Sequence, residues 1–221
     1  MEGIENIESK DFEIVDQLNF RIRLLGITEL INNQLFERVH PCLVNKNTYI
    51  GNVNGVMNAI QIEGDAVGPT LHYGAGAGSE PTASAVVADI VDLVRALTTD
   101  PNNRVPHLAF QAQSLADLPI LNIDRTETRF YLRLAALDRP GVLADITRIL
   151  GFQSISIEAI LQKGTSSQGR IVPIVIITHV TLEKAMNEAI LEIEALDCVH
   201  GVVHRIRLEN LSPHSTNQKV K

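Results

Sequence analysis

The stretch RFYLRLAALDRPGVLADITRILG, residues 129–151, decides the fold of the C-terminal part of the chain. Its first half predicts a strand over residues 129–137. A helix follows, with Asp138 as its expected N-cap and Pro140 in its first turn. The buried stripe of this helix consists of apolar residues at helical spacing: Val142, Leu143, Ile146, Ile149 and Leu150. Gly151 fits the left-handed position that ends such a helix.

The segments that follow complete a compact unit over residues 128–208. Strands are predicted over residues 154–162, 170–180 and 202–208, with a Gly/Ser hairpin loop over 163–169 and a second helix that Thr181 caps. The order strand, helix, strand, strand, helix, strand is the ferredoxin-like arrangement, in which two helices cover one face of a four-stranded antiparallel sheet. The other face must also be covered, and we expect pairing with a second copy to cover it.

The first 98 residues predict a further α+β region with a mixed or antiparallel sheet. The expected elements are a helix over about residues 9–18 with Ser9 as its N-cap, strands over 20–30, 34–44, 56–63 and 70–73, and a helix over 81–97. The last helix carries an apolar stripe formed by Val86, Val87, Ile90, Val91, Val94 and Leu97. Residues 99–127 are expected to be a linker, and residues 209–221 a flexible tail.

Composition and charge exclude several classes of function. Only 4% of the 221 residues are aromatic and the net charge is −7, so we expect no nucleic-acid partner. No apolar run approaches the roughly 20 residues of a membrane span, and the acidic, polar first ten residues are not a signal peptide. Cys42 and Cys198 make no metal-binding pattern and indicate a reduced cytosolic protein. We therefore expect a cytoplasmic protein without membrane association or bound metal.

A glycine-rich loop runs directly into the helix predicted over residues 81–97. The sequence YGAGAGSEPTAS, residues 73–84, can turn backbone N–H groups toward an anion at a helix start, where the helix dipole adds positive potential. A phosphate-bearing cofactor or a carboxylate would suit this place. The spacing GxGxG differs from the Rossmann fingerprint GxGxxG, and a hairpin precedes it. A tight turn, in which glycines permit close helix–sheet packing, is an equally good interpretation.

The second candidate site is the turn DRPGVL, residues 138–143. Gly141 is expected in the first turn of the helix, where its free N–H and its lack of a side chain would admit an amino-acid carboxylate. Spacing alone favours a simpler interpretation, a plain N-cap followed by a helix-starting proline.

Other polar residues indicate no chemistry of their own. His200 and His204 would lie about 13 Å apart along a strand, too far to share a metal ion. Arg38 and His40 at a strand edge are expected to be solvated or paired. No Ser–His–Asp or Cys–His spacing stands out, so no catalytic residue is assigned.

Several motifs in the first 98 residues resemble homoserine dehydrogenase. They are Glu2-Gly3-Ile4, IRLLGI at residues 22–27, RVHP at 38–41, NVNGVMNA at 52–59 and the glycine motif with its helix at 73–89. In that family the glycine loop lies against an NAD(P) cofactor that is bound mainly by an N-terminal Rossmann domain. The resemblance therefore implies cofactor-contacting residues at Gly74, Gly76, Ala77, Gly78 and Thr82.

Residues 128–208 resemble the ACT domain, the effector-binding module of many bacterial homoserine dehydrogenases. The matching segments are the turn at residues 138–143 and the strand that begins Ile155-Ser156-Ile157 and ends in Gln162. The resemblance implies L-threonine as a feedback inhibitor, bound by Asp138, Pro140, Gly141, Val142, Leu143, Ile155 and Ser156. It also implies a homo-oligomer, either a dimer or a tetramer, that assembles through the core sheet and the ACT domains.

One departure from the family pattern limits the expected activity. The family begins with a Rossmann domain and a catalytic segment with acidic and lysine residues, and both would precede Met1. We therefore expect the C-terminal portion of an NAD(P)-dependent homoserine dehydrogenase of threonine, methionine and isoleucine biosynthesis, with neither tight cofactor binding nor activity of its own. Two rival interpretations are a stand-alone amino-acid-binding regulator and a purely structural dimerisation module.

Overall fold

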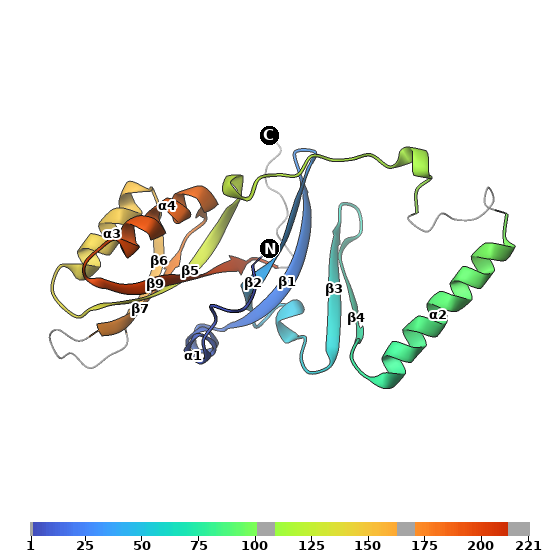
Figure 1. Ribbon diagram of the computed structural model, residues 1–221, viewed down its shortest axis with the longest axis horizontal. Helices are drawn as coiled ribbons and strands as arrows, with labels where there is room; N and C mark the ends of the chain where they lie inside the picture. The colour runs from blue at the N-terminus through green and yellow to red at the C-terminus, as the bar shows by residue number, and fades with distance from the viewer. Residues whose placement is uncertain (1, 101–108, 163–170, 212–221) are drawn as a thin grey trace. The chain divides into compact units, whose positions relative to one another are not determined.

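The computed structural model describes residues 2–100, 109–162 and 171–211 (Figure 1). The chain packs into two compact units. The first comprises Met1–Lys46 and Pro119–Leu211, and the second begins at Asn47 and ends at Leu118. These packing units differ from the division that the sequence predicts, because residues 1–46 pack with residues 119–211. The hairpin loop expected over 163–169 and nearly all of the expected tail lie outside the described residues.

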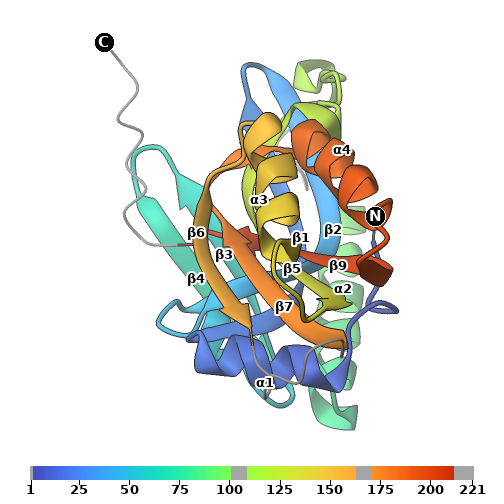
Figure 2. The ribbon, with the colours of Figure 1, turned by 90° about the vertical axis from the view of Figure 1, so that its left-hand side faces the viewer.

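One seven-stranded mixed sheet forms the centre of the first unit. Its elements are α1 (Ser9–Gln17), β1 (Phe20–Ile31), β2 (Gln34–Asn45), β5 (Glu127–Leu137), α3 (Val142–Phe152), β6 (Ile157–Gln162), β7 (Ile171–Thr178), β8 (Thr181–Leu182), α4 (Glu183–Glu194) and β9 (Val199–Glu209). The strand order is β1-β2-β9-β5-β7-β6, and β8 pairs with β5. The strands β9, β5, β7 and β6 pair antiparallel, with α3 and α4 on one face (Figure 2). The predicted ferredoxin-like α+β fold is therefore confirmed.

The hairpin β1–β2 extends this sheet beyond the four expected strands. β2 runs parallel to β9, with Cys42 opposite Arg207 and Leu43 opposite Leu208. Cys42, Leu43 and Leu208 are buried, which gives this junction an apolar interior. The N-terminal hairpin and the ferredoxin-like strands therefore form one continuous sheet.

Both faces of this sheet carry a hydrophobic core. On one face, the cluster that includes Leu132, Ile146 and Met186 packs between the sheet and the helices α3 and α4. On the opposite face, Tyr131 and other strand residues pack against Val15 of α1. Figure 1 shows α1 and the pair α3 and α4 on opposite sides of the sheet. A second copy was the expected cover for this face, and α1 covers at least part of it.

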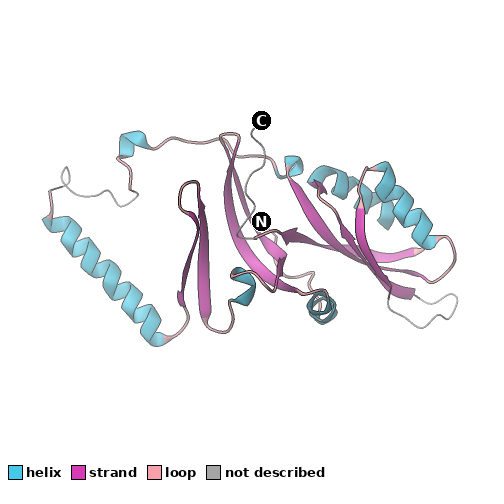
Figure 3. Cartoon of the chain, turned by 180° about the vertical axis from the view of Figure 1, so that it is seen from behind, coloured by secondary structure: helices cyan, strands magenta, loops and turns pink. Residues whose placement is uncertain are grey.

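The second unit consists mainly of a β-hairpin and a long helix (Figure 3). β3 (Met57–Gly64) pairs antiparallel with β4 (Gly68–Ala75), and α2 (Ser79–Thr98) follows; short 3-10 turns lie at Ile50–Asn52 and Ala112–Ser114. The apolar stripe predicted for the helix is present, but no residue of α2 is buried. Val86, Ile90 and Val94 are each more than half exposed. Among the described residues, both hydrophobic clusters belong to the first unit.

The expected start of α3 was wrong. Gly141 is the N-cap and Val142 the first helical residue, so Asp138 and Pro140 precede the helix. Gly141 has a φ of 95°, a left-handed conformation that is incompatible with a right-handed helix, so the helix begins only at the next residue. Gly151 lies inside α3, and the left-handed residue after the helix is Ser154, with a φ of 57°.

The expected caps of α1 and α4 were also wrong. Glu8 rather than Ser9 is the N-cap of α1, and the Asp11 carboxylate accepts a hydrogen bond from the Glu8 N–H at 2.9 Å. Leu182 is the N-cap of α4, because Thr181 pairs with Thr128 as part of β8. A capping box between Glu8 and Asp11 sets the start of α1, and strand pairing of Thr181 displaces the cap of α4, so residue type alone misplaced both.

Candidate functional site

The expected effector turn, residues 138–143, joins β5 to α3. A Cβ added to Gly141 would meet no heavy atom within 4 Å, so the space beside the turn is open. The Asp138 carboxylate accepts a hydrogen bond from the Gln162 amide at 3.3 Å, which connects the turn to the end of β6. The turn therefore offers open backbone at the start of an 11-residue helix, where anions are favoured.

Three of the other expected effector residues contribute to the core. Val142 and Ile155 are buried in the cluster beneath α3 and α4, and Leu143 packs against that cluster. Ser156 is exposed, and its carbonyl accepts a hydrogen bond from the His179 N–H at 2.8 Å. The structure brings Val142, Leu143 and Ile155 together by packing, and an effector role for them stays a prediction.

The expected cofactor loop leads from β4 into α2. Gly76 lies close to β3: its N–H donates to the Val56 carbonyl at 3.2 Å, and a Cβ there would lie 1.9 Å from Asn58 Nδ2. Gly78 has a φ of 123°, and its carbonyl accepts the Thr82 N–H at 3.2 Å. The left-handed φ gives Gly78 a structural reason to be glycine, whereas at Gly76 a Cβ would require the Asn58 side chain to move. Gly74, Gly76, Ala77, Gly78 and Thr82 are all exposed in the described chain.

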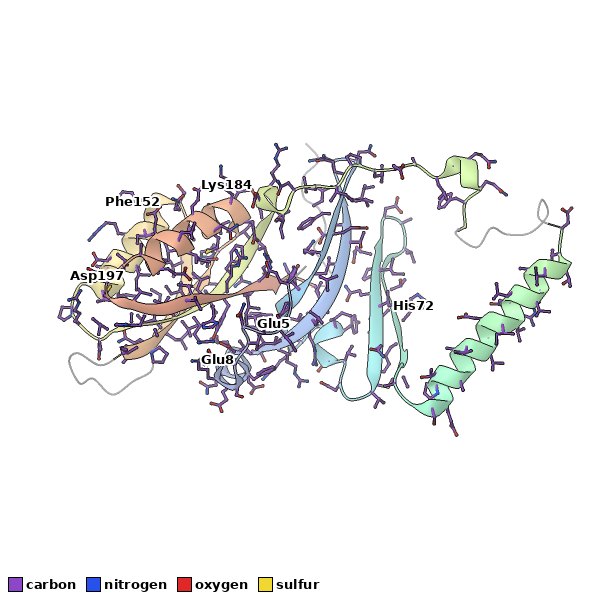
Figure 4. All side chains as sticks on the ribbon, viewed as in Figure 1. Glu5, Glu8, His72, Phe152, Lys184 and Asp197 are labelled. Carbon is purple, nitrogen blue, oxygen red and sulfur yellow. The ribbon has the colours of Figure 1, made fainter. Side chains whose placement is uncertain are left out.

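A buried ionic cluster, which the sequence reasoning missed, ties α1 to β5. Arg133 Nε lies 2.5 Å from Asp11 Oδ1, and Arg133 Nη2 contacts Asp11 Oδ2 at 3.0 Å and Glu8 Oε1 at 2.9 Å. The Tyr131 hydroxyl donates to Asp11 at 3.0 Å. Asp11 and Arg133 are almost fully buried, whereas Glu8 lies at the exposed start of α1 (Figure 4). Burial and the Asp11 carboxylate together raise the pKa of Tyr131.

A second buried arginine ties the first residues of the chain to β9. The Arg207 guanidinium contacts Glu183 at 2.5 and 2.9 Å and both carboxylate oxygens of Glu2 at 2.8 Å. Arg205 adds contacts to Glu183 at 2.9 Å and to Glu2 at 3.3 Å. The hydrogen bonds from Arg207 lower the pKa of Glu2 to about 2, against the opposing effect of burial. One sequence signal for these clusters is an arginine inside an otherwise apolar strand, but no local pattern reveals the acidic partners.

Arg38 of β2 is paired, as expected, and His40 is buried beside the same glutamate, Glu209. Arg38 contacts Glu209 at 3.0 Å and Glu29 at 2.8 Å. His40 Nε2 lies 3.5 Å from Glu209, and Nδ1 lies 3.1 Å from the Pro41 carbonyl. Burial lowers the pKa of His40. The RVHP motif thus supports the junction between β2 and β9.

Two cavities flank α1. The larger, about 640 Å³, is lined by α1 and β1 residues that include Phe12, Arg21 and Arg23. The smaller, about 190 Å³, lies between α1 and the strands β6 and β7. Neither is lined by residues 138–143 or by the glycine loop.

Neither a metal-binding cluster nor a membrane-spanning helix occurs among the described residues. No three His, Cys, Asp or Glu side chains in that part of the chain are grouped so that they could hold a metal ion. Within the same ranges, no helix is long and apolar enough to cross a membrane.

Comparison with known proteins identifies the two halves of the chain. The homoserine dehydrogenase family model matches residues 1–91, and the ACT domain model matches residues 130–196. A homoserine dehydrogenase from Pseudomonas aeruginosa is 52% identical over 211 residues, which are 96% of this chain and 49% of that protein. The chain belongs to the homoserine dehydrogenase family. It spans about half the length of the relatives that it matches.

A solved homoserine dehydrogenase supports the assignment. The structure from Thiobacillus denitrificans has a TM-score of 0.85 and 57% identity, over 95% of this chain and 47% of that one. The protein from Neisseria gonorrhoeae is 46% identical over 96% of this chain and 48% of its own length. Within the first unit, Glu2, Glu8 and Asp11 belong to the homoserine dehydrogenase match, and Arg133 and Glu183 to the ACT match. The buried ionic clusters therefore connect the two family regions.

Proposed function

We propose that this chain supplies the C-terminal half of an NAD(P)-dependent homoserine dehydrogenase, which interconverts L-homoserine and L-aspartate 4-semialdehyde. The observation that carries the proposal is the succession of a homoserine dehydrogenase match and an ACT match along one chain. The parent enzyme would serve threonine, methionine and isoleucine biosynthesis in the cytoplasm.

In this proposal the glycine loop faces the cofactor. Its exposed backbone at Gly76, Ala77 and Gly78 lies at the start of the 20-residue helix α2, where the helix dipole favours an anionic group such as a phosphate. Gly74 and Thr82 would flank the contact. The fit is partial, since the Gly76 N–H is already bonded to Val56. When bound, the nicotinamide would exchange a hydride with the substrate.

The chain alone is proposed to be catalytically inactive and to bind the cofactor weakly. The glycine loop follows the hairpin β3–β4, which is not the strand–loop–helix unit that binds dinucleotides. The exposed apolar stripe of α2 supports a need for a further protein surface, because stripes of this kind are normally buried.

The regulatory part of the proposal places an amino-acid effector, L-threonine, at the turn formed by residues 138–143. The left-handed Gly141 and the open space beside it support a carboxylate contact with the backbone at the start of α3. The proposal includes a homo-oligomer, because side-chain contacts from a second copy could complete an effector site that is open on one side.

A stand-alone amino-acid-binding regulator is the second candidate. The first unit supports this candidate, because it has a buried core on both faces of its sheet and includes all residues of the ACT match.

An activity assay with L-homoserine and NADP tests whether the chain acts as a complete enzyme, and we expect the chain alone to give no turnover. Measurable turnover would contradict the proposed inactivity. Light scattering after size exclusion tests the assembly, and a strict monomer would count against the homo-oligomer.

A further inference from the structure

Two buried arginines hold the first 17 residues of the chain against the ferredoxin-like strands. Arg133 lies on β5 and Arg207 on β9, and these two strands are neighbours in the sheet. Arg133 contacts Asp11 and Glu8, and Arg207 contacts Glu2. The segment formed by residues 2–17 therefore meets the sheet through charged groups at its first residue and again around the start of α1.

The strength of these ion pairs depends on their burial. Arg133 and Arg207 are 4% and 3% exposed, and Asp11 is not exposed at all. A buried guanidinium that loses its carboxylate partner has little water to replace it, so each contact is strongly favoured over its absence. Displacement of β5 relative to α1, or of β9 relative to Glu2, is therefore resisted by these pairs.

The same elements lead to the effector turn. β5 carries Tyr131 and Arg133 and ends at Leu137, directly before the turn at residues 138–143. Glu183, which holds Arg207, is the first residue of α4, and α4 shares a core with α3, the helix that the turn begins. One strand and one packed helix pair thus connect the turn to both arginine clusters.

We propose that residues 2–17 are the output element of the sensor, and that Arg133 and Arg207 couple this segment to the turn at residues 138–143. The inference rests on the proposed effector role of that turn. The segment lies in the homoserine dehydrogenase match, and Arg133 lies in the ACT match, so the coupling crosses from the regulatory region to the enzyme region. Arg133 and Arg207 are positioning residues in this account.

Coupling between two sites is reciprocal, which allows a test without any ligand. Hydrogen exchange of the full chain, read by mass spectrometry, would be compared for the unaltered protein, Asp11→Asn and Tyr131→Phe. Tyr131→Phe removes only the hydroxyl that donates to Asp11 and leaves the ion pair in place. Asp16→Asn is the matched control, because Asp16 lies on the same helix but is 68% exposed and pairs with Lys46.

We expect Asp11→Asn to speed exchange in residues 9–17 by about tenfold or more, the effect of losing a hydrogen bond to a charged group. Exchange at residues 138–143 should rise by about threefold or more, as for a coupled site. Tyr131→Phe should change both regions in the same direction by less, and Asp16→Asn should change neither. If circular dichroism shows that Asp11→Asn is unfolded, the exchange rates of Tyr131→Phe decide whether the two regions are coupled.

Faster exchange in residues 9–17 with no change at residues 138–143 would overturn the coupling. Adding L-threonine to the unaltered chain separates this inference from the proposed function. Protection of the turn and of residues 9–17 together supports both. Absence of any threonine effect counts against the effector role, while the ligand-free comparison still decides the coupling.

Discussion

Asp11→Asn tests the buried pair between α1 and β5 most simply. The Asp11 carboxylate is completely buried and accepts hydrogen bonds from Arg133 Nε at 2.5 Å, from Arg133 Nη2 at 3.0 Å and from the Tyr131 hydroxyl at 3.0 Å. The substitution keeps the size of the side chain and removes its charge. Arg133 then stays buried with a single carboxylate contact, to Glu8 at 2.9 Å.

The expected loss follows from the burial of both partners. Removing one member of a buried ion pair costs about 3–5 kcal/mol of unfolding free energy. Because Glu8 remains and the amide oxygen can still accept one hydrogen bond, we expect about 3 kcal/mol, the lower end of that range. Urea unfolding of the full chain, followed by circular dichroism, measures the change.

Two further variants make the measurement specific. Asp16→Asn, on the exposed side of the same helix, should leave the urea midpoint unchanged within error. Combining Asp11→Asn with Arg133→Met should give a coupling free energy of at least about 1 kcal/mol, because the two residues are in direct contact. The reasoning is refuted if Asp11→Asn costs less than about 1 kcal/mol, or if it costs no more than Asp16→Asn.

Three other predictions concern pH, packing and thiol reactivity. The lowered pKa of Glu2, about 2, means that its contact with Arg207 stabilises the fold above the ordinary pKa of 4.5, and that this contribution is lost as the pH falls from there through 2. Glu2→Gln should flatten stability over that window in acid unfolding curves, and an unchanged pH dependence would contradict the assignment. Gly76→Ala should change the unfolding free energy by less than about 0.5 kcal/mol, because the new methyl group meets only the side chain of the exposed Asn58, which can turn aside, and a loss above about 1 kcal/mol in urea unfolding would contradict this. Burial raises the pKa of the Cys42 thiol to about 12, so mass spectrometry should find it unmodified by thiol reagents until denaturant is added, and rapid labelling in native buffer would show that the site is open.

The local pattern of the sequence predicted most of the ferredoxin-like fold. Strand and helix periodicities are short-range signals, and the elements from β5 to β9 follow them closely. The start of α3 was misjudged because Asp138 and Pro140 have the composition of a helix start, whereas Gly141 adopts a left-handed φ after them. A glycine in a left-handed conformation occurs both in turns and at helix ends, so the presence of Gly141 in the sequence does not show where α3 begins.

Long-range pairing was the part that the sequence could not predict. β2 pairs with β9, and Asp11 pairs with Arg133, between segments that are more than 100 residues apart in the chain. No periodicity within either segment specifies its partner. The cover that α1 gives to the second face of the sheet is missed for the same reason, because a short helix with a mixed composition shows no local sign of its packing surface.

Calorimetric titration of the full chain with L-threonine tests the central claim most directly, alongside Gly141→Ala and the matched glycine variant Gly151→Ala. A methyl group meets no neighbour at either position, but only Gly141 has the left-handed φ that an alanine disfavours. We predict saturable binding to the unaltered chain and to Gly151→Ala, and binding about tenfold weaker to Gly141→Ala, which corresponds to about 1.4 kcal/mol. No binding to the unaltered chain, or equal binding to all three proteins, would contradict a threonine sensor built on the turn at residues 138–143.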